Sequence, residues 1–358
     1  MPTPLSELRS WLSRTGAAVS SANPTRFLAR PQGSPDETMA NRVADNRIED
    51  RRTAGPVGRW RPRLPVAAVD RTSVALSLEG SAVRFLTTNR ERVAGWSTIP
   101  LIDRAASSGQ INDPLALGAA IDAAFEDFQL SRQRVSWALP GFGVTTRLIE
   151  LPNLRPRELE EAVREDFDRV LGVSLDDNYL FWERLTGRIR QRLVFALAVP
   201  KSGVLAALEA LEVANIKPRT MDLRPLALAR AAGRGDAIVT NLEDGSLDVV
   251  IIDRGVPAAM RSISIPGSSV AREVAQNRLI EETERALAYY DDANPDHPLD
   301  VDTPIYLTGS WATGNALAEK IHTVTRHPIG RFKPDGIYPP ELPLTEYAVN
   351  LGLSLKRV

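Results

Sequence analysis

Two glutamates at equivalent places in short turns are the residues of this sequence that bear most directly on chemistry. Glu79 lies in the Glu-Gly-Ser turn of SVALSLEGSAVRFL, and Glu243 lies in the Glu-Asp-Gly-Ser turn of VTNLEDGSLDVVII. A hairpin with small residues in its turn can present backbone N–H groups to a phosphate, whereas a carboxylate at that point repels one. Two facing carboxylates are also the side chains of a general acid/base pair or of a metal site.

The rest of the sequence gives such a catalytic or metal-binding role no support. No histidine or further ligand lies near either turn, and His297, His322 and His327 do not have the spacing of a metal site. We therefore predict no catalytic residues and no metal ligands. The simplest interpretation is that both glutamates are solvated turn residues.

The elements that position the two turns form a repeated unit. Alternating apolar residues predict strands at 74–78, 82–87 and 91–99, a helix that begins at Pro114 after Asn112 or Asp113, and a strand in RVSWALP. We expect Ile121, Phe125 and Phe128 to line one face of this helix. The same order returns in AIVTNLE, LDVVIID and GVPAAMRSISIP, followed by a helix over roughly 270–291 and the strand IYLTG. The repeat predicts two similar lobes that face each other.

A mixed α+β segment separates the two copies. It contains a predicted strand at 145–152, a helix with Leu159, Val163, Phe167 and Val170 on its inner face, and a hairpin formed by YLFWERL and RLVFALAVP. Two further helices follow, and the chain closes with a helix that has Tyr347, Leu351 and Leu355 on its inner face. We therefore divide this mixed α/β chain into a leader (1–65), a first lobe (66–143), an inserted α+β subdomain with a connecting helix (144–235), a second lobe (236–333) and a closing helix (334–358).

Composition narrows the possible function classes. The 358 residues carry a net charge of −1, which gives no general attraction to nucleic acid or to an anionic membrane. The absence of cysteine excludes disulfides and thiolate sites, and no apolar run reaches the ~18 residues of a membrane span. The leader lacks sustained periodicity and is expected to be flexible, except for one amphipathic stretch formed by Leu5, Leu8, Trp11 and Leu12.

Several stretches, in this order, resemble the type IV pilus assembly protein PilM family of the actin-like ATPase superfamily. They are ALPGFGVTTRLIELPNL, ALEALEVANIKPRTMDLRPLALARAA, RGVPAAMRSI, ERALAYY, IYLTGS and YAVNLGLSL. The resemblance covers about residues 73–358. It implies an actin-like, ribonuclease H-like fold of two lobes with an inserted α+β subdomain.

The resemblance also implies a nucleotide cleft between the lobes, and this sequence departs from its pattern. The family's loop aspartates, which help to hold the metal, fall on Ser77 and Asn241, and its loop glycines fall on Glu79 and Glu243. Each carboxylate beside a polyanion would cost on the order of a few kcal/mol in a partly desolvated cleft. We therefore expect a pseudo-ATPase with weak or absent binding of ATP and magnesium. Its degenerate cleft would comprise Ser77, Glu79, Gly80, Ser81, Asn241, Glu243, Gly245, Gly309 and Ser310.

For partners, the resemblance implies a cytoplasmic scaffold at the inner face of the cell membrane that binds the cytoplasmic tail of a PilN-like inner-membrane protein. The tail would lie in a groove between the first lobe and the insert, near strand 145–151 and helix 158–171. Candidate partner-binding residues are Leu5, Leu8, Trp11, Leu12, Arg147 and Ile149. The alternatives are a working ATPase, an FtsA-like filament-forming protein, or a component of another secretion apparatus, and the oligomeric state is left open.

Overall fold

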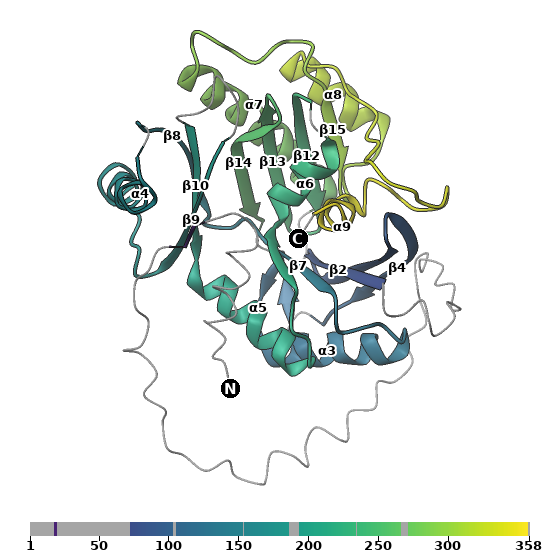
Figure 1. The fold of residues 1–358 in the computed structure, drawn as a ribbon. Helices are drawn as coiled ribbons and strands as arrows, with labels where there is room; N and C mark the ends of the chain where they lie inside the picture. The colour runs from purple at the N-terminus through teal and green to yellow at the C-terminus, as the bar shows by residue number, and fades with distance from the viewer. Residues whose placement is uncertain are drawn as a thin grey trace.

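The chain is built from two sheet-containing lobes, with the second above the first in Figure 1, and a third sheet lies at the left of this view, level with the second lobe. The computed structural model describes residues 18–19, 72–102, 105–152, 154–185, 193–233, 235–265 and 271–356. Among the helices of these ranges, none combines the length and the apolar character that a bilayer-spanning segment needs.

The first lobe contains a five-stranded sheet in the order β11-β7-β2-β3-β4. Strands β2, β3 and β4 form an antiparallel meander, whereas β7 and β11 run parallel to β2. Helices α3 and α5 cover one face over a core that includes Phe85, Trp137 and Leu211. The bounds are β2 Thr72–Glu79, β3 Ala82–Asn89, β4 Arg92–Pro100, β5 Ala106–Ser107, β6 Gln110–Ile111, α3 Pro114–Asp127, β7 Val135–Leu139, α5 Lys201–Val213 and β11 Thr220–Leu223.

Helix α3 begins where the sequence predicts. Asp113 is its N-cap and accepts hydrogen bonds from the backbone N–H groups of Leu115 and Ala116, each at 3.0 Å. Ile121 and Phe125 are buried on the inner face, as expected. Phe128 lies just past the helix end, where its ring makes an edge contact with Phe85 at a centroid distance of 5.0 Å.

The second lobe repeats this arrangement. Its sheet has the order β14-β13-β12-β15, with an antiparallel meander and with β15 parallel to β12. The predicted repeat of a meander, a helix and a parallel strand is therefore confirmed. The bounds are β12 Ala237–Glu243, β13 Ser246–Asp253, β14 Val256–Ser264, α7 Arg272–Ala293, β15 Ile305–Thr308 and α8 Asn315–Thr325.

The third sheet has the order β1-β9-β10-β8 and belongs to the insert. Helix α4 covers one face and buries Leu159, Val163 and Phe167 against residues that include Leu180 and Trp182. The side chain of Val170 lies outside the described residues. The bounds are β1 Ala18–Val19, β8 Thr145–Glu150, α4 Pro156–Leu171, β9 Asn178–Arg184 and β10 Leu193–Pro200.

Two details differ from the sequence prediction. The segment 144–235 is predicted to form an inserted α+β subdomain with a connecting helix; within it, α5 packs on the first lobe and β11 extends the sheet of that lobe through β7. Within the predicted flexible leader, β1 pairs antiparallel with β9, with Ala18 opposite Trp182. The Leu5–Leu12 stretch lies outside the described residues.

Helices α6 (Arg224–Ala232) and α9 (Ala348–Ser354) lie between the two lobes (Figure 1). They cross closely, because a Cβ atom on Gly352 would lie 1.9 Å from the carbonyl oxygen of Ala227. Tyr347 and Leu351 face inward as predicted. Leu355 follows the helix end and is half-buried.

Candidate functional site

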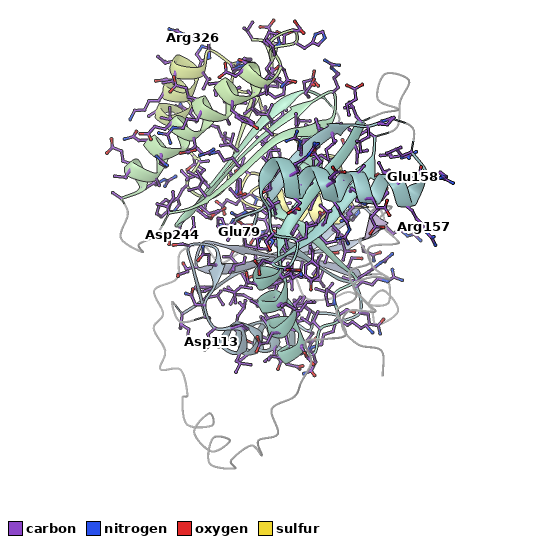
Figure 2. All side chains as sticks on the ribbon, turned by 90° about the vertical axis from the view of Figure 1, so that its left-hand side faces the viewer. Glu79, Asp113, Arg157, Glu158, Asp244 and Arg326 are labelled. Carbon is purple, nitrogen blue, oxygen red and sulfur yellow. The ribbon has the colours of Figure 1, made fainter. Side chains whose placement is uncertain are left out.

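The two turns that carry the glutamates are in direct contact at the junction of the lobes. Gly80 adopts a φ of +60°, and a Cβ atom on it would lie 2.5 Å from the backbone oxygen of Asp244. Ser81 Oγ lies 3.5 Å from Asp244 Oδ2. Figure 2 shows Glu79 and Asp244 close together at this junction. Protein atoms therefore occupy the space where the turns approach each other.

The β5–β6 hairpin also packs against both turns. The Gly109 N–H donates to the Gly80 carbonyl at 3.0 Å, and Ser108 Oγ donates to the Ile265 carbonyl at 3.1 Å. A Cβ atom on Gly245, which has a φ of +75°, would lie 2.5 Å from Ser108 Oγ. This hairpin therefore bridges the first lobe to the turn of the second.

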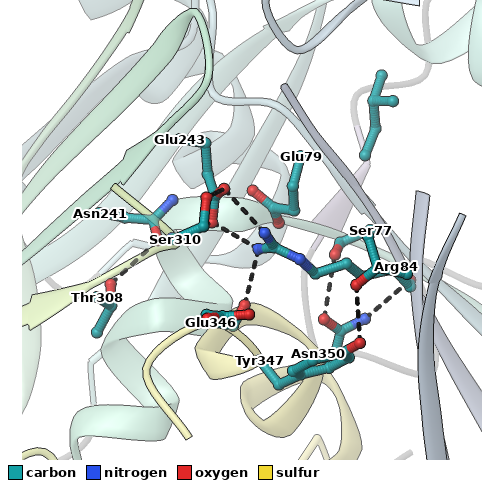
Figure 3. A network of polar contacts seen from close by, with 12 residues as sticks. Ser77, Glu79, Arg84, Asn241, Glu243, Thr308, Ser310, Glu346, Tyr347 and Asn350 are labelled. Carbon is teal, nitrogen blue, oxygen red and sulfur yellow. Dashed lines mark hydrogen bonds and ion pairs between the residues drawn. The ribbon is translucent and has the colours of Figure 1, made fainter. Parts of the chain in front are cut away.

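Arg84 of β3 joins the lobes through Glu243 (Figure 3). Its two terminal nitrogens contact the two carboxylate oxygens of Glu243 at 2.5 and 2.9 Å, and one of them also donates to the Glu346 carbonyl at 2.8 Å. The backbone N–H and the hydroxyl of Ser310 complete the hydrogen bonding of Glu243, at 3.1 and 2.6 Å. Burial alone would lower the pKa of Arg84, but the Glu243 carboxylate outweighs burial and raises the pKa above its usual value.

Arg224, the first residue of α6, forms a second buried ion pair. Its Nε lies 2.8 Å from Asp248 Oδ2, and a terminal nitrogen lies 3.5 Å from Glu79 Oε2. Asp248 also accepts hydrogen bonds from Ser262 Oγ at 2.5 Å and from Asn241 Nδ2 at 3.2 Å. Arg224 and Asp248 are almost fully buried. We refer to Arg84–Glu243 and Arg224–Asp248/Glu79 together as the interlobe ion pairs.

Glu79 is less well compensated than Glu243. Its side chain is buried, and neither carboxylate oxygen has a hydrogen-bond partner among the described residues. Burial raises the pKa of Glu79 to about 7, although the charge of Arg224 lowers it; the negative charge of Glu243 adds to the increase. The expectation that Glu79 and Glu243 are solvated turn residues is therefore wrong, because both are buried beside arginines.

The positions that correspond to the family's aspartates hold neutral groups in hydrogen bonds. Ser77 Oγ donates to Asn350 Oδ1 at 3.2 Å, and Asn350 Nδ2 donates to the Ala75 and Arg84 carbonyls at 3.0 and 3.1 Å. In the second lobe, Thr308 Oγ1 donates to Asn241 Oδ1 at 3.1 Å. Figure 3 shows both sets flanking the Arg84–Glu243 pair.

Gly309 places its backbone against the second turn. Gly309 has a φ of +93°, and a Cβ atom on it would lie 2.3 Å from the Leu242 carbonyl oxygen. Ser310 can then reach Glu243.

All nine residues of the predicted cleft lie at the junction of the lobes. The structure adds four residues that the sequence analysis did not name: Arg84, Arg224, Asp248 and Asn350. The two arginines could have been noticed in the sequence, because each is a cation next to apolar residues, in AVRFL and in RPLALARAA.

The predicted partner-binding residues of the insert have structural contacts. Arg147 Nε forms an ion pair with Asp166 Oδ2 of α4 at 2.9 Å, and Ile149 is buried beneath α4. A cavity of about 380 Å³ lies where the end of β10 meets the first lobe, and no residue of β8 or α4 lines it. It is lined by β6, α5 and the ends of β7 and β10, and the lining carries no charged side chain.

The site can hold its lobes together by charge, but it has no cluster suited to a metal. Within the ranges that the structure describes, no group of three or more Asp, Glu, His or Cys side chains is arranged to hold a metal ion. The positive charge between the turns comes from the two arginines.

Two facing sheets of repeated topology, with hairpin turns meeting between them, define the fold of the actin-like ATPases. The chain belongs to the type IV pilus assembly protein PilM family, whose sequence model matches residues 82–270, more than half of its length. A solved structure of a PilM-PilN type IV pilus biogenesis complex is similar, with a TM-score of 0.63 and 21% identity over 79% of this chain and 97% of that chain.

More distant structural similarity extends beyond this family. The ethanolamine utilization protein EutJ from Carboxydothermus hydrogenoformans has a TM-score of 0.47 and 12% identity, over 79% of this chain and 89% of its own. A Bacteroides thetaiotaomicron protein with an actin-like ATPase fold has the same score and identity, over 82% and 100%. A comparison with curated protein sequences finds no significant match.

Proposed function

We propose that this protein is a non-catalytic scaffold of a type IV pilus assembly or related secretion machine. In this role it binds the cytoplasmic tail of a PilN-like partner at the inner face of the cell membrane. The observation that carries the non-catalytic part is the set of interlobe ion pairs between the two turns. The family membership and the similarity to the PilM-PilN complex support the choice of machine and partner.

Three features of the junction between the lobes work against nucleotide binding. A phosphate chain between the turns would have to separate Gly80 from Asp244, which are in contact. It would also have to break the Arg84–Glu243 pair, and leaving one partner of a buried pair alone costs about 3–5 kcal/mol. Finally, the Glu243 carboxylate would repel the phosphates, and Glu79 would add to this repulsion as it ionises above its pKa of about 7.

Calorimetric titration with ATP and magnesium tests this part of the proposal. We expect no saturable heat at nucleotide concentrations up to the millimolar range. Binding in the micromolar range would contradict the pseudo-ATPase assignment and would favour a working ATPase.

The uncharged cavity between the first lobe and the insert fits the proposed tail. It is lined by apolar side chains that include Ile111, Leu139, Phe142 and Val204. An extended segment of the partner could bury its own apolar residues against these side chains. Gly203 at the start of α5 also lines this cavity, and a Cβ atom on it would meet nothing within 4 Å. Gly203 is therefore a lining position at which an added side chain starts in open space.

The substitution Gly203→Trp tests partner binding in the full chain. We expect it to weaken binding of a peptide with the sequence of the partner's cytoplasmic tail by at least ~10-fold, equivalent to about 1.4 kcal/mol. Gly235→Trp is the matched control, because Gly235 is also exposed and free of neighbours within 4 Å but lies outside this cavity. Equal peptide affinity of the two variants, or no binding by the unmodified protein, would contradict the proposal.

A further inference from the structure

A second cavity, of about 200 Å³, lies at the opposite end of the first sheet from the two turns. It is lined at the amino-terminal ends of the parallel strands β2, β7 and β11, next to the end of α9. The turns are at the carboxyl end of β2, so this cavity is separate from the junction of the lobes. Its size is below the ~300 Å³ at which pockets for drug-sized molecules begin.

Hydroxyl side chains from four adjacent strands form one side of this cavity. Thr88 lies opposite Ser73 in the β2–β3 ladder, and Ser136 lies opposite Thr220 in the β7–β11 ladder. Their neighbours Val74, Val135 and Met221 point into the core under α3 and α5. Because side chains alternate along a strand, the hydroxyls are on the other face, beneath the end of α9.

Three cationic side chains line the same cavity. Arg134 and Arg219 immediately precede β7 and β11, and Lys356 follows α9. No carboxylate is among the lining residues. The Lys356 ammonium lies 3.3 Å from Asp222, which is also paired with Arg230 at 2.8 Å. The charged side chains among the lining residues are therefore all cationic.

Two of the lining groups favour an anionic occupant. Thr220 is fully buried, and its hydroxyl has no hydrogen-bond partner in the part of the chain that the structure describes. A buried hydroxyl without a partner is destabilising, and a ligand acceptor would satisfy it. Burial lowers the pKa of Lys356 despite the charge of Asp222, and a bound anion would stabilise its charged form.

We propose that this cavity binds a phosphate group, either as free phosphate or as the head group of an anionic lipid. Guanidinium groups form charge-assisted hydrogen bonds with phosphate oxygens, and the hydroxyl groups supply further hydrogen-bond donors. The assignment does not depend on the proposed scaffold function.

Calorimetric titration of the full chain with inorganic phosphate at constant ionic strength tests the proposal. The double variant Arg134→Gln/Arg219→Gln should bind at least ~10-fold more weakly, because two charge-assisted contacts are lost. Thr220→Val, which keeps the shape of the side chain, should bind several-fold more weakly with an unchanged circular dichroism spectrum. Arg169→Gln, an exposed charge on α4, is the control and should bind like the unmodified protein.

Co-sedimentation with vesicles distinguishes the two sources of the phosphate group. Binding to phosphatidylglycerol vesicles but not to phosphatidylcholine vesicles, with loss in the double variant, identifies a lipid head group. Binding of inorganic phosphate alone identifies a soluble anion. The proposal is overturned if neither ligand binds, or if the double variant and Thr220→Val bind as well as Arg169→Gln.

Discussion

Removing the arginine of the Arg84–Glu243 pair is the most direct test of how the lobes are held together. In Arg84→Met the aliphatic part of the side chain is retained, but Glu243 loses its cation. The side chains of Arg84 and Glu243 are 6% and 2% exposed, so solvent screening is small. Two unit charges ~4 Å apart interact by about 4 kcal/mol at an effective dielectric constant of ~20.

We therefore expect Arg84→Met to lower the free energy of unfolding by about 3–5 kcal/mol, which is the usual cost of leaving one partner of a buried pair unpaired. That is a large share of the ~5–15 kcal/mol that stabilises a typical protein. Urea unfolding followed by tryptophan fluorescence and circular dichroism measures the loss.

A second substitution separates the charge effect from the packing effect. In Arg84→Met/Glu243→Gln the side chain at 243 is neutral and can still bond to Ser310, so we expect recovery of at least about half of the loss. The control Arg155→Met breaks an exposed pair with Glu158 and should have a much smaller effect. The reasoning is refuted if Arg84→Met is as stable as the unmodified protein, or if the second substitution adds to the loss.

Two other substitutions test the remaining groups at the junction. Because the folded-state pKa of Glu79 is raised from 4.5 to about 7, its contribution to stability is fully present below pH 4.5 and is lost as the pH rises through about 7. Glu79→Gln should therefore remove a decline of roughly 2–3 kcal/mol between pH 5 and pH 8, measured by urea unfolding; an unchanged pH profile would show that Glu79 is not responsible. Gly80→Ala should destabilise more than Gly172→Ala by at least ~1 kcal/mol, since both have φ near +60° but only Gly80 faces the Asp244 backbone. Equal losses of stability would indicate that the two turns are not in contact in solution.

Local patterns in the sequence were sufficient to predict the positions of most helices and strands. The alternating apolar residues of β2 to β4 and the Asp113-Pro114 cap of α3 depend on neighbouring residues, and their predicted positions are confirmed. The addition of β11 to the first sheet was not predictable in this way, because it depends on pairing with β7 after the whole insert has intervened.

The candidate site shows the same division between local and long-range information. The two turns could be located from their sequences, but the burial of their glutamates could not. Arg84 and Glu243 are 159 residues apart, so no local pattern reveals that they are paired. Without that partner, a glutamate in a turn is most simply interpreted as solvated.

The Arg84–Glu243 pair also affects how the arrangement of the lobes, with their two turns in contact, responds to protein concentration and to salt. Both partners belong to one chain, so their effective concentration is set by the covalent structure and does not change on dilution. Since the pair is buried, added salt screens it only weakly. This arrangement should therefore persist in the same form across protein concentrations and ionic strengths, which keeps the surfaces of the two lobes in one fixed relative position.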